Sequence, residues 1–359
     1  MRLGAGIAVA AFGVWCASLT SAHDPINTKI TWDREISAIV ERRCISCHAP
    51  GGFGTFPLTT YEEARPWAVA IKELTLAGEM PPWGAAPGIG HFANDRRLTR
   101  HELEVVAAWV DGGAPRTLPD PDSQPPTADR QPPTANHQPP TASAAAGTMI
   151  PLASAVITEA TDRAASATLQ LPAGLVLTRW SFEPGSPAII ERVDLELGPR
   201  WLGTWTPGDE SIDFPPDAGM PLPASALFTA RIAYRSPAER TIDYSRLRIW
   251  MEKEARPRSL REGSVVRGWR TTEPVSIVAL RPAREGAAID VVARFANGRV
   301  EPIAALTPPG RAPHPTYFLA RPLALPAGAR VETTGPVRLL YTTGATRRVN
   351  PNVSTRPPR

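Results

Sequence analysis

Histidine and cysteine are both scarce in this chain, which has six histidines and three cysteines among 359 residues. Beyond Ile150 the one histidine is His314, and because prolines flank it we expect it on a surface loop. A copper site takes several nitrogen ligands, which a single imidazole cannot supply. The scarcity therefore predicts no copper site, no Ser/His/Asp arrangement and no catalytic residue in the C-terminal part of the chain.

Runs of like charge are also lacking. Lys and Arg number 39 against 35 Asp and Glu, and no Lys/Arg run stands out, so we expect no nucleic-acid binding. The longest apolar run, Leu3–Leu19, follows the lone charge of Arg2 and precedes the small residues Thr20-Ser21-Ala22. This pattern predicts a signal peptide over residues 1–22, cleaved after Ala22, and a periplasmic or secreted protein without a transmembrane segment. Cys16 would leave with it.

The two remaining cysteines form Cys44-Ile45-Ser46-Cys47-His48. Two thiols spaced by two residues can each add to a haem vinyl group, and the adjacent histidine can then ligate the iron. A redox dithiol leaves His48 unexplained, and a zinc site needs two further ligands although no second cysteine pair exists. The motif predicts one covalent haem c, anchored by Cys44 and Cys47 and ligated by His48.

Met80 is the candidate for the opposite axial position. It lies 32 residues after His48 (80 − 48), in Gly78-Glu79-Met80-Pro81-Pro82-Trp83, where the prolines favour an extended segment. A Met/His pair favours electron transfer, because it leaves no open position on the iron. His91 and His101 are alternative ligands, and Met80 as a flexible core filler is the structural alternative.

Helical signals precede residue 116. Thr60 and Glu63 form one capping box, and Thr99 and Glu102 form another. We expect three short helices: one capped by Asp33 and carrying Ile36, Ile39 and Val40, one from Thr60 to Gly78, and one from Thr99 to Gly112-Gly113.

A tandem repeat of Gln-Pro-Pro-Thr-Ala over residues 124–142 predicts a polyproline II spacer within a linker of residues 116–150. Asn297-Gly298 after it is typical of a hairpin turn. Alternating segments predict strands at 169–171, 193–197, 226–234, 247–250, 275–280 and 289–295. Short strands with Pro/Gly turns favour an antiparallel sandwich or jelly roll. We expect Asp194, Glu196 and Asp243 to be solvated strand or turn residues.

Residues 32–115 resemble a family of periplasmic cytochrome c domains. The matching motifs are Trp32-Asp33, Cys44-x-x-Cys47-His48, Tyr61-Glu-Glu-Ala-Arg-Pro-Trp67, Met80-Pro-Pro-Trp83, Phe92-Ala-Asn-Asp-Arg96 and Ala108-Trp-Val-Asp-Gly-Gly-Ala-Pro115. In that family the Met of Met-Pro-Pro-Trp looks like the axial ligand, which implies the same role for Met80.

The C-terminal part is similar in outline to the type II copper, ascorbate-dependent monooxygenases, which consist of two jelly rolls with a copper in each. The similar segments are Glu183-Pro-Gly-Ser-Pro187, Leu202-Gly-Thr-Trp-Thr-Pro-Gly208, Leu222-Pro-Ala224, Asp243-Tyr-Ser-Arg246, Leu325-Pro-Ala-Gly328 and Val349-Asn-Pro-Asn352. Where that family carries copper histidines, this chain has Glu191-Arg192, Ala233-Tyr234-Arg235 and Arg281-Pro282-Ala283.

The resulting prediction is a multidomain protein: signal peptide 1–22, a small all-α cytochrome c domain 23–115, a Pro-rich linker 116–150, and an all-β domain 151–359 with a jelly-roll-like fold, single or double. It is a single-haem electron-transfer protein rather than an enzyme, and its redox partner proteins are the donor and acceptor. The alternatives are a haem-linked copper monooxygenase and a structural subunit of a larger redox complex.

Overall fold

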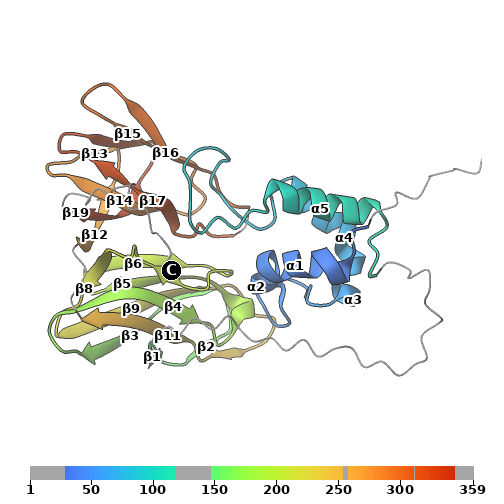
Figure 1. The fold of residues 1–359 in the computed structure, drawn as a ribbon. Helices are drawn as coiled ribbons and strands as arrows, with labels where there is room; N and C mark the ends of the chain where they lie inside the picture. Colours follow the sequence, from blue (N-terminus) through green and yellow to red (C-terminus); the bar gives the residue numbers. More distant parts are fainter. Residues whose placement is uncertain (1–28, 118–146, 254–257, 311, 344–359) are drawn as a thin grey trace, which may run out of the picture.

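The computed structural model describes residues 29–117, 147–253, 258–310 and 312–343. The predicted signal peptide and the Gln-Pro-Pro-Thr-Ala repeats lie outside these residues. A small helical region, residues 29–117, precedes a larger β region, residues 147–343, and the two lie side by side (Figure 1). The expectation of a mostly β protein with a small helical part is confirmed.

The helical region is built from short elements: η1 (Trp32–Ile36), α1 (Ser37–Arg43), α2 (Ile45–His48), α3 (Tyr61–Ala64), η2 (Arg65–Trp67), α4 (Ala68–Leu76) and α5 (Arg100–Asp111).

Both predicted capping boxes are present. Thr60 accepts a hydrogen bond from the backbone N–H of Glu63, and Thr99 accepts one from Glu102; each glutamate carboxylate in turn accepts from the backbone N–H of its cap residue. The predicted cap at Asp33 is wrong. The first helix begins at Trp32, and the Glu35 carboxylate instead accepts from the backbone N–H of Thr31 at 2.9 Å.

The second predicted helix is interrupted around Pro66, whose ring removes a backbone donor. The chain there forms the three-residue turn η2 between α3 and α4. The predicted end at Gly78 is confirmed, because this residue has a φ of 72°, outside helical space.

A small apolar core joins η1, α1 and α5. Trp109 of α5 is fully buried against Trp32, and its indole N–H donates to the carbonyl of Pro115 at 3.0 Å. Glu102 of α5 pairs with Arg43, the residue before Cys44, at 3.1 Å. Helix α5 therefore fixes the end of α1, from which the Cys44–His48 motif begins.

The β region consists of these strands and one turn of 3-10 helix: β1 (Thr148–Pro151), β2 (Ala155–Ile157), β3 (Thr161–Gln170), β4 (Leu175–Glu183), η3 (Pro187–Ile189), β5 (Ile190–Leu197), β6 (Arg200–Trp205), β7 (Ile212–Asp213), β8 (Ala218–Pro221), β9 (Ser225–Tyr234), β10 (Thr241–Asp243), β11 (Arg246–Lys253), β12 (Arg258–Val265), β13 (Gly268–Arg270), β14 (Val275–Pro282), β15 (Ile289–Arg294), β16 (Val300–Leu306), β17 (Tyr317–Leu325), β18 (Arg330–Thr333) and β19 (Val337–Thr343).

One long sheet runs through both halves of the β region in the order β1-β11-β4-β8-β12-β19-β14-β17, with β7 paired to β4. Two four-stranded sheets pair as β3-β9-β5-β6 and β13-β18-β15-β16. Each packs through its own apolar cluster against one end of the long sheet. The parallel pair β8–β12 makes the long sheet continuous between the two halves.

Two local features bear on the sequence predictions. The Asn297-Gly298 turn is confirmed, because Gly298 has a φ of 84° and Arg294 pairs with Val300 across the hairpin. Strand β1 begins at Thr148, inside the segment predicted as linker, because Thr148–Pro151 pairs with β11. Among helices in the described residues, none has the length and apolar character needed to cross a bilayer.

Residues 83–97 connect the two regions, although the sequence assigned them to the helical part alone. Ala85 pairs with Leu306 of β16, and Phe92 pairs with Leu319 of β17. Trp83 and Phe92 lie in the apolar cluster between the sheet β13-β18-β15-β16 and the long sheet, where both contact the ring of Tyr317. This connecting segment, residues 83–97, therefore fastens the helical region to the β region.

Candidate functional site: the Cys44–His48 turn and the β surface against it

The predicted haem-attachment residues form one helical turn. The backbone N–H groups of Cys47 and His48 both donate to the carbonyl of Cys44, at 3.1 and 2.9 Å. Cys44 and Cys47 are both free thiols and, like His48, are half-buried. The turn thus presents two thiols and an imidazole together, as the motif predicts.

His48 is held in one tautomer. Its Nδ1 lies 2.9 Å from the carbonyl oxygen of Phe56, which can only accept, so Nδ1 carries the proton and donates. The other ring nitrogen, Nε2, is therefore the one with a lone pair for a metal. Histidine ligands in proteins are oriented in this way by a partner on their second nitrogen.

The loop after the motif wraps closely around this imidazole. A Cβ on Gly54 would lie 2.6 Å from Nδ1 of His48, so no side chain fits at that position. The Phe56 ring contacts the imidazole at 5.0 Å and stacks on Trp67 at 4.1 Å between centroids. The histidine is thus fixed both by its hydrogen bond and by its packing.

Burial raises the pKa of the Cys44 thiol to about 12, with Cys47 adding to the shift, and burial also raises the pKa of Cys47. Reactive dithiols owe their activity to a lowered thiol pKa. Both side chains are therefore protonated and weakly nucleophilic at neutral pH, which disfavours the redox-dithiol interpretation.

The segment from residue 67 to residue 80 exposes several large apolar side chains. Met80 is 39% exposed, so it does not fill the core, and its backbone N–H donates to the carbonyl of Leu74. Exposed apolar side chains crowd the segment from residue 67 to residue 80: Trp67, Val69, Leu74, Leu76 and Met80. Soluble proteins seldom expose such a cluster without a ligand or partner. Trp67 connects it to His48 through Phe56.

The two alternative ligands, His91 and His101, lie outside the Cys44–His48 turn and outside the segment 67–80. His91 is exposed within the connecting segment, and its carbonyl accepts from Ala320 of the β region at 2.7 Å. His101 is exposed in the first turn of α5.

The β region touches the attachment turn through a buried ion pair. Arg96 of the connecting segment pairs with Asp209 at 2.6 Å and donates to Thr206 and to the carbonyl of Pro207 at 2.8 and 2.9 Å. Gly208 of the same turn lies beside Ser46, inside the Cys-x-x-Cys spacing. The pKa of Arg96 is raised because Asp209 outweighs the effect of burial.

A second arginine reaches the loop that holds His48. Arg235, which follows β9, donates to the carbonyl of Phe53 at 2.8 Å and lies over the Phe53 ring at 4.3 Å. Its Nε donates to Ala188 within the β region at 2.6 Å. Arg96 thus holds the Gly208 turn of the β region beside Ser46, and Arg235 joins the β region to the loop after the attachment turn. The sequence named both residues, Arg96 in a family motif and Arg235 at a copper-histidine position, but it did not predict these contacts, because the partners lie more than a hundred positions away.

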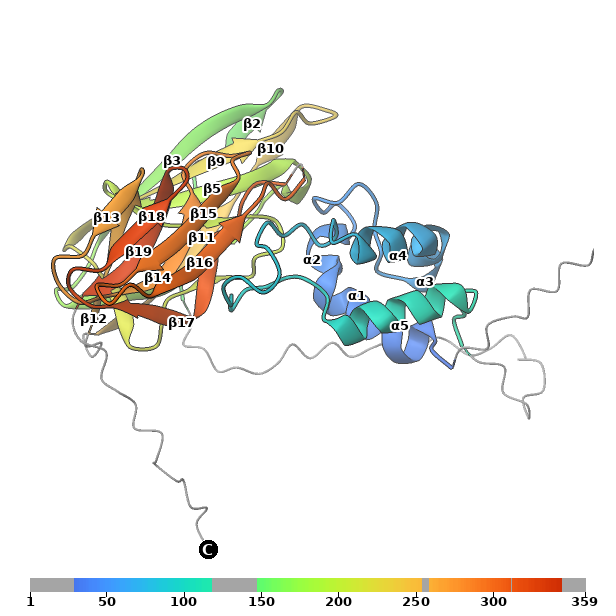
Figure 2. The ribbon, with the colours of Figure 1, turned by 90° about the horizontal axis from the view of Figure 1, so that it is seen from above.

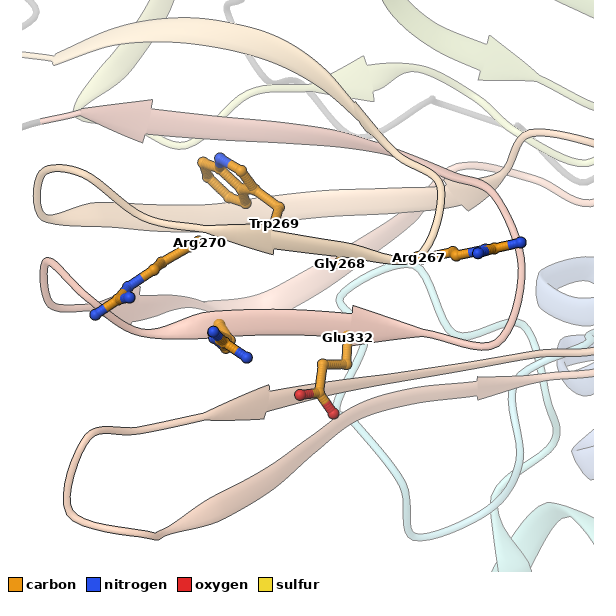
Figure 3. Close-up of a pocket in the computed structure, with 6 residues that line it drawn as sticks. Arg267, Gly268, Trp269, Arg270 and Glu332 are labelled. Atoms are coloured by element: carbon orange, nitrogen blue, oxygen red, sulfur yellow. The ribbon is translucent and has the colours of Figure 1, made fainter.

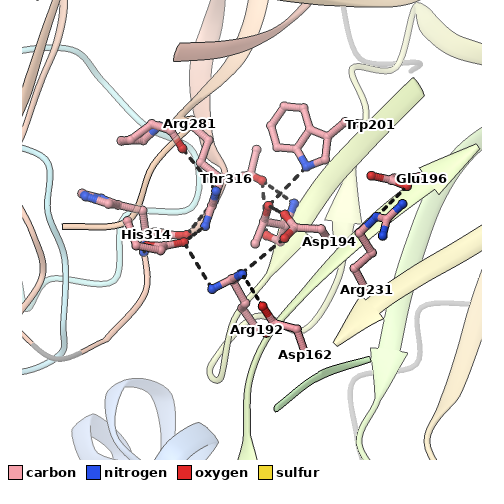
Figure 4. A network of polar contacts seen from close by, with 12 residues as sticks. Asp162, Arg192, Asp194, Glu196, Trp201, Arg231, Arg281, His314 and Thr316 are labelled. Atoms are coloured by element: carbon pink, nitrogen blue, oxygen red, sulfur yellow. Dashed lines mark hydrogen bonds and ion pairs between the residues drawn. The ribbon is translucent and has the colours of Figure 1, made fainter. Parts of the chain in front are cut away.

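Two of the positions that correspond to copper histidines in the resembled family, Arg192 and Arg281, form ion pairs with carboxylates. Arg192 approaches Asp194 at 3.3 Å and Asp162 and Glu285 at 3.9 Å (Figure 4). Arg281 pairs with Glu285. Within the described residues, no group of three or more His, Cys, Asp or Glu residues could hold a metal ion.

The expectation that His314 lies on the surface is wrong. It is 1% exposed, its Nδ1 lies 2.9 Å from the Tyr317 hydroxyl, and its carbonyl accepts from Arg281 at 2.9 Å (Figure 4). The connecting segment covers it, since a Cβ on Gly84 would lie 3.3 Å from its ring. Burial accordingly lowers the pKa of His314.

Asp243 is also not solvated as expected. It is 2% exposed and accepts hydrogen bonds from the hydroxyls of Tyr234 and Ser245, both at 2.8 Å. Burial and this bond raise the pKa of Tyr234. These hydrogen bonds join the end of β9 to the turn between β10 and β11.

A shallow hollow of about 440 Å³ on β13 and β18 is lined by Arg267, Gly268, Trp269, Arg270, Arg330 and Glu332. The labelled side chains of Arg267 and Arg270 point away from each other (Figure 3). The hollow therefore offers no converging set of groups for a ligand.

Comparisons with known proteins add no assignment. No protein-family model matches the chain, and no curated protein matches it. Among solved structures, it is similar to the major capsid protein P2 of bacteriophage PM2 with 11% identity, over 56% of this chain and 99% of that chain. The TM-score is 0.26, which does not establish a shared fold.

Proposed function

We propose that this protein is a single-haem c-type cytochrome that transfers one electron at a time. The observation that carries the proposal is the turn of Cys44, Cys47 and His48, in which the carbonyl of Phe56 holds the imidazole with Nε2 free for a metal. Free thiols and an exposed apolar surface beside the turn suit covalent haem binding.

Each residue has a distinct role in this proposal. Cys44 and Cys47 would hold the haem through two thioethers, and His48 and Met80 would supply the two protein ligands of its iron. The bound haem supplies a single-electron redox couple. Its apolar faces would cover part of the apolar surface that the segment 67–80 exposes, where Trp67 already stacks on Phe56. With both axial positions filled, we assign no catalytic step to the chain.

The proposed domains follow the sequence analysis, except that the linker ends at β1. A signal peptide of residues 1–22 directs the chain to the periplasm, residues 23–115 form the cytochrome c domain, and the linker runs from residue 116 to the start of β1 at Thr148. From Thr148 onward the chain forms a β domain that resembles a double jelly roll, an arrangement suggested by two four-stranded sheets that share one long sheet. This domain docks on the attachment turn, and the electron donor and acceptor are separate proteins.

Removing the thiols one at a time tests the proposal. The pyridine haemochrome of the wild-type protein should show one haem per chain with both vinyl groups saturated. Cys44→Ser and Cys47→Ser should each keep haem through one thioether and shift the α band toward that of a haem with one free vinyl group. The double variant should lose all haem on acidic acetone extraction. A wild-type protein whose haem is extracted, or that contains none, contradicts the proposal.

Copper content of the same preparation separates the proposal from the copper monooxygenase alternative. We expect no copper to remain after dialysis against a chelator. Stoichiometric copper that survives dialysis would favour the oxygenase.

A further inference from the structure

Strand β3 is an unprotected sheet edge. It is the terminal strand of β3-β9-β5-β6 and pairs with β9 at all ten residues from Thr161 to Gln170, without a bulge. Its other side has no backbone partner among the described residues. Every second residue of an edge strand points its N–H and C=O outward, so this side offers about five of each.

The other sheet edges within the described residues are short or protected; β2 and β10 have three residues each and β7 has two. Strand β1 has four residues and ends at Pro151, and β13 has three residues. Strands β16 and β17 contain Pro302 and Pro322, and the connecting segment pairs with both. Strand β6 is bulged against β5 and almost wholly buried. Natural proteins block edges with prolines, bulges, short strands and charges. Strand β3 is long and regular and contains neither proline nor lysine.

The apolar core also ends abruptly at this edge. On β9 the inward-facing residues Ala226, Phe228 and Ala230 are fully buried. Their partners on β3, which are Leu169, Ala167 and Ala165, are only half-buried although they face the same core. The core layer therefore continues to the free side of β3, where no described residue covers it. Figure 2 draws β3 along the outer margin of the β region.

We propose that β3 pairs with β3 of a second copy of this chain, antiparallel about a two-fold axis at Ser166. In this register Ala165 faces the partner's Ala167, Ala164 faces the partner's Thr168, and Asp162 faces the partner's Gln170. No like charges stand opposite each other, and the small side chains permit close approach. In this register odd-numbered residues face odd-numbered residues, and even face even. Because side chains alternate between the two faces of a strand, the apolar face of one copy continues that of the other.

This pairing makes one eight-stranded sheet from two four-stranded sheets and covers Ala165, Ala167 and Leu169 of each copy. It is a C2 interface, the commonest symmetry among soluble oligomers. The helical region lies to one side of the β region, away from the free side of β3 (Figures 1 and 2), so the attachment turn of each copy stays accessible.

Cysteine cross-linking of the haem-containing, full-length mature protein tests the register. Ser166→Cys places two thiols opposite each other across the axis, and we expect a disulfide-linked dimer under mild oxidation. Thr229→Cys is the matched control: it pairs with Ser166 within the same sheet but lies one strand farther from the axis. Equal cross-linking of the two variants would overturn the register.

Charge pairs test the interface without relying on disulfides. Positions 164 and 168 are both exposed, so substitutions there leave the core intact. In the Ala164→Lys/Thr168→Lys variant lysine meets lysine across the axis, and sedimentation should show a dimer dissociation constant raised at least tenfold. In the Ala164→Lys/Thr168→Glu variant lysine meets glutamate, and the constant should stay within threefold of wild type. A wild-type chain that stays monomeric at several hundred micromolar, or two variants that dissociate alike, would overturn the proposal.

Discussion

Replacing Arg96 by alanine should weaken the hold of the β region on the attachment turn. Arg96 joins the connecting segment to the Thr206–Asp209 turn by charge, and its partner Asp209 has a side chain only 6% exposed. Truncating one partner of a buried ion pair costs about 3–5 kcal/mol, because the other charge stays buried and unpaired. Asp209 retains hydrogen bonds from the backbone and hydroxyl of Thr206 at 2.8 and 3.0 Å. We therefore expect the low end, about 3 kcal/mol.

Urea unfolding of the haem protein measures this loss, with Soret absorbance reporting on the helical region and tryptophan fluorescence on the whole chain. The Soret transition of Arg96→Ala should move to lower urea by an amount equivalent to about 3 kcal/mol at an unchanged slope. A double-mutant cycle with Asp209→Ala should give a coupling energy of about 2 kcal/mol, since paired residues in one network couple by 0.5–3 kcal/mol.

The matched control is the Arg100–Glu104 pair on α5, whose side chains are 93% and 62% exposed. Such surface pairs contribute about 0.2–1 kcal/mol, so Arg100→Ala should shift the transition little. A cycle at Arg96 and Asp209 that gives no more coupling than the control would refute the role of this pair in holding the β region to the turn.

Three further outcomes are expected. Gly54→Ala should lower the haem-to-protein ratio several-fold, because the new methyl would lie 2.6 Å from the His48 ring, and a normal ratio with an unchanged spectrum would contradict this. Glu102→Gln should destabilise the protein by about 1–2 kcal/mol at neutral pH. Burial alone would raise the pKa of Glu102, but hydrogen bonds from Thr99 and Arg43 outweigh it, so the pKa is lowered. The stability that the ionised Glu102 contributes is therefore full above about pH 5 and disappears as the pH falls through the folded pKa. Denaturation curves from pH 3 to 7 should show the free energies of unfolding of wild type and Glu102→Gln converging at low pH, and a difference that does not depend on pH would contradict this. Met80→Ala should change the oxidised spectrum and lower the midpoint potential, and an unchanged spectrum would remove Met80 as the distal ligand.

Local signals in the sequence predict local structure well. The capping boxes at Thr60 and Thr99 involve atoms three residues apart, and both form. The Asn297-Gly298 turn is equally local and also forms. The Cys44–His48 spacing predicts the shared turn, because one turn of helix determines where its side chains lie.

What the sequence misses depends on distant partners. The sequence does not predict most of strand β3, because Asp162–Ala167 is rich in alanine and lacks the β-branched residues that mark strands, and pairing with β9 decides its conformation. His314 looked exposed between prolines, but the connecting segment, over 200 residues earlier, covers it. The contacts of Arg96 with Asp209 and of Arg235 with Phe53 likewise join residues far apart in the sequence, which no short motif predicts.

The mass of the intact mature chain under denaturing conditions tests the central claim most directly. The account predicts a single species that begins at His23 and is heavier than the polypeptide by the mass of one haem, with no copper in the native sample. A species at the polypeptide mass, or two hydrogens lighter through a disulfide between Cys44 and Cys47, would contradict it.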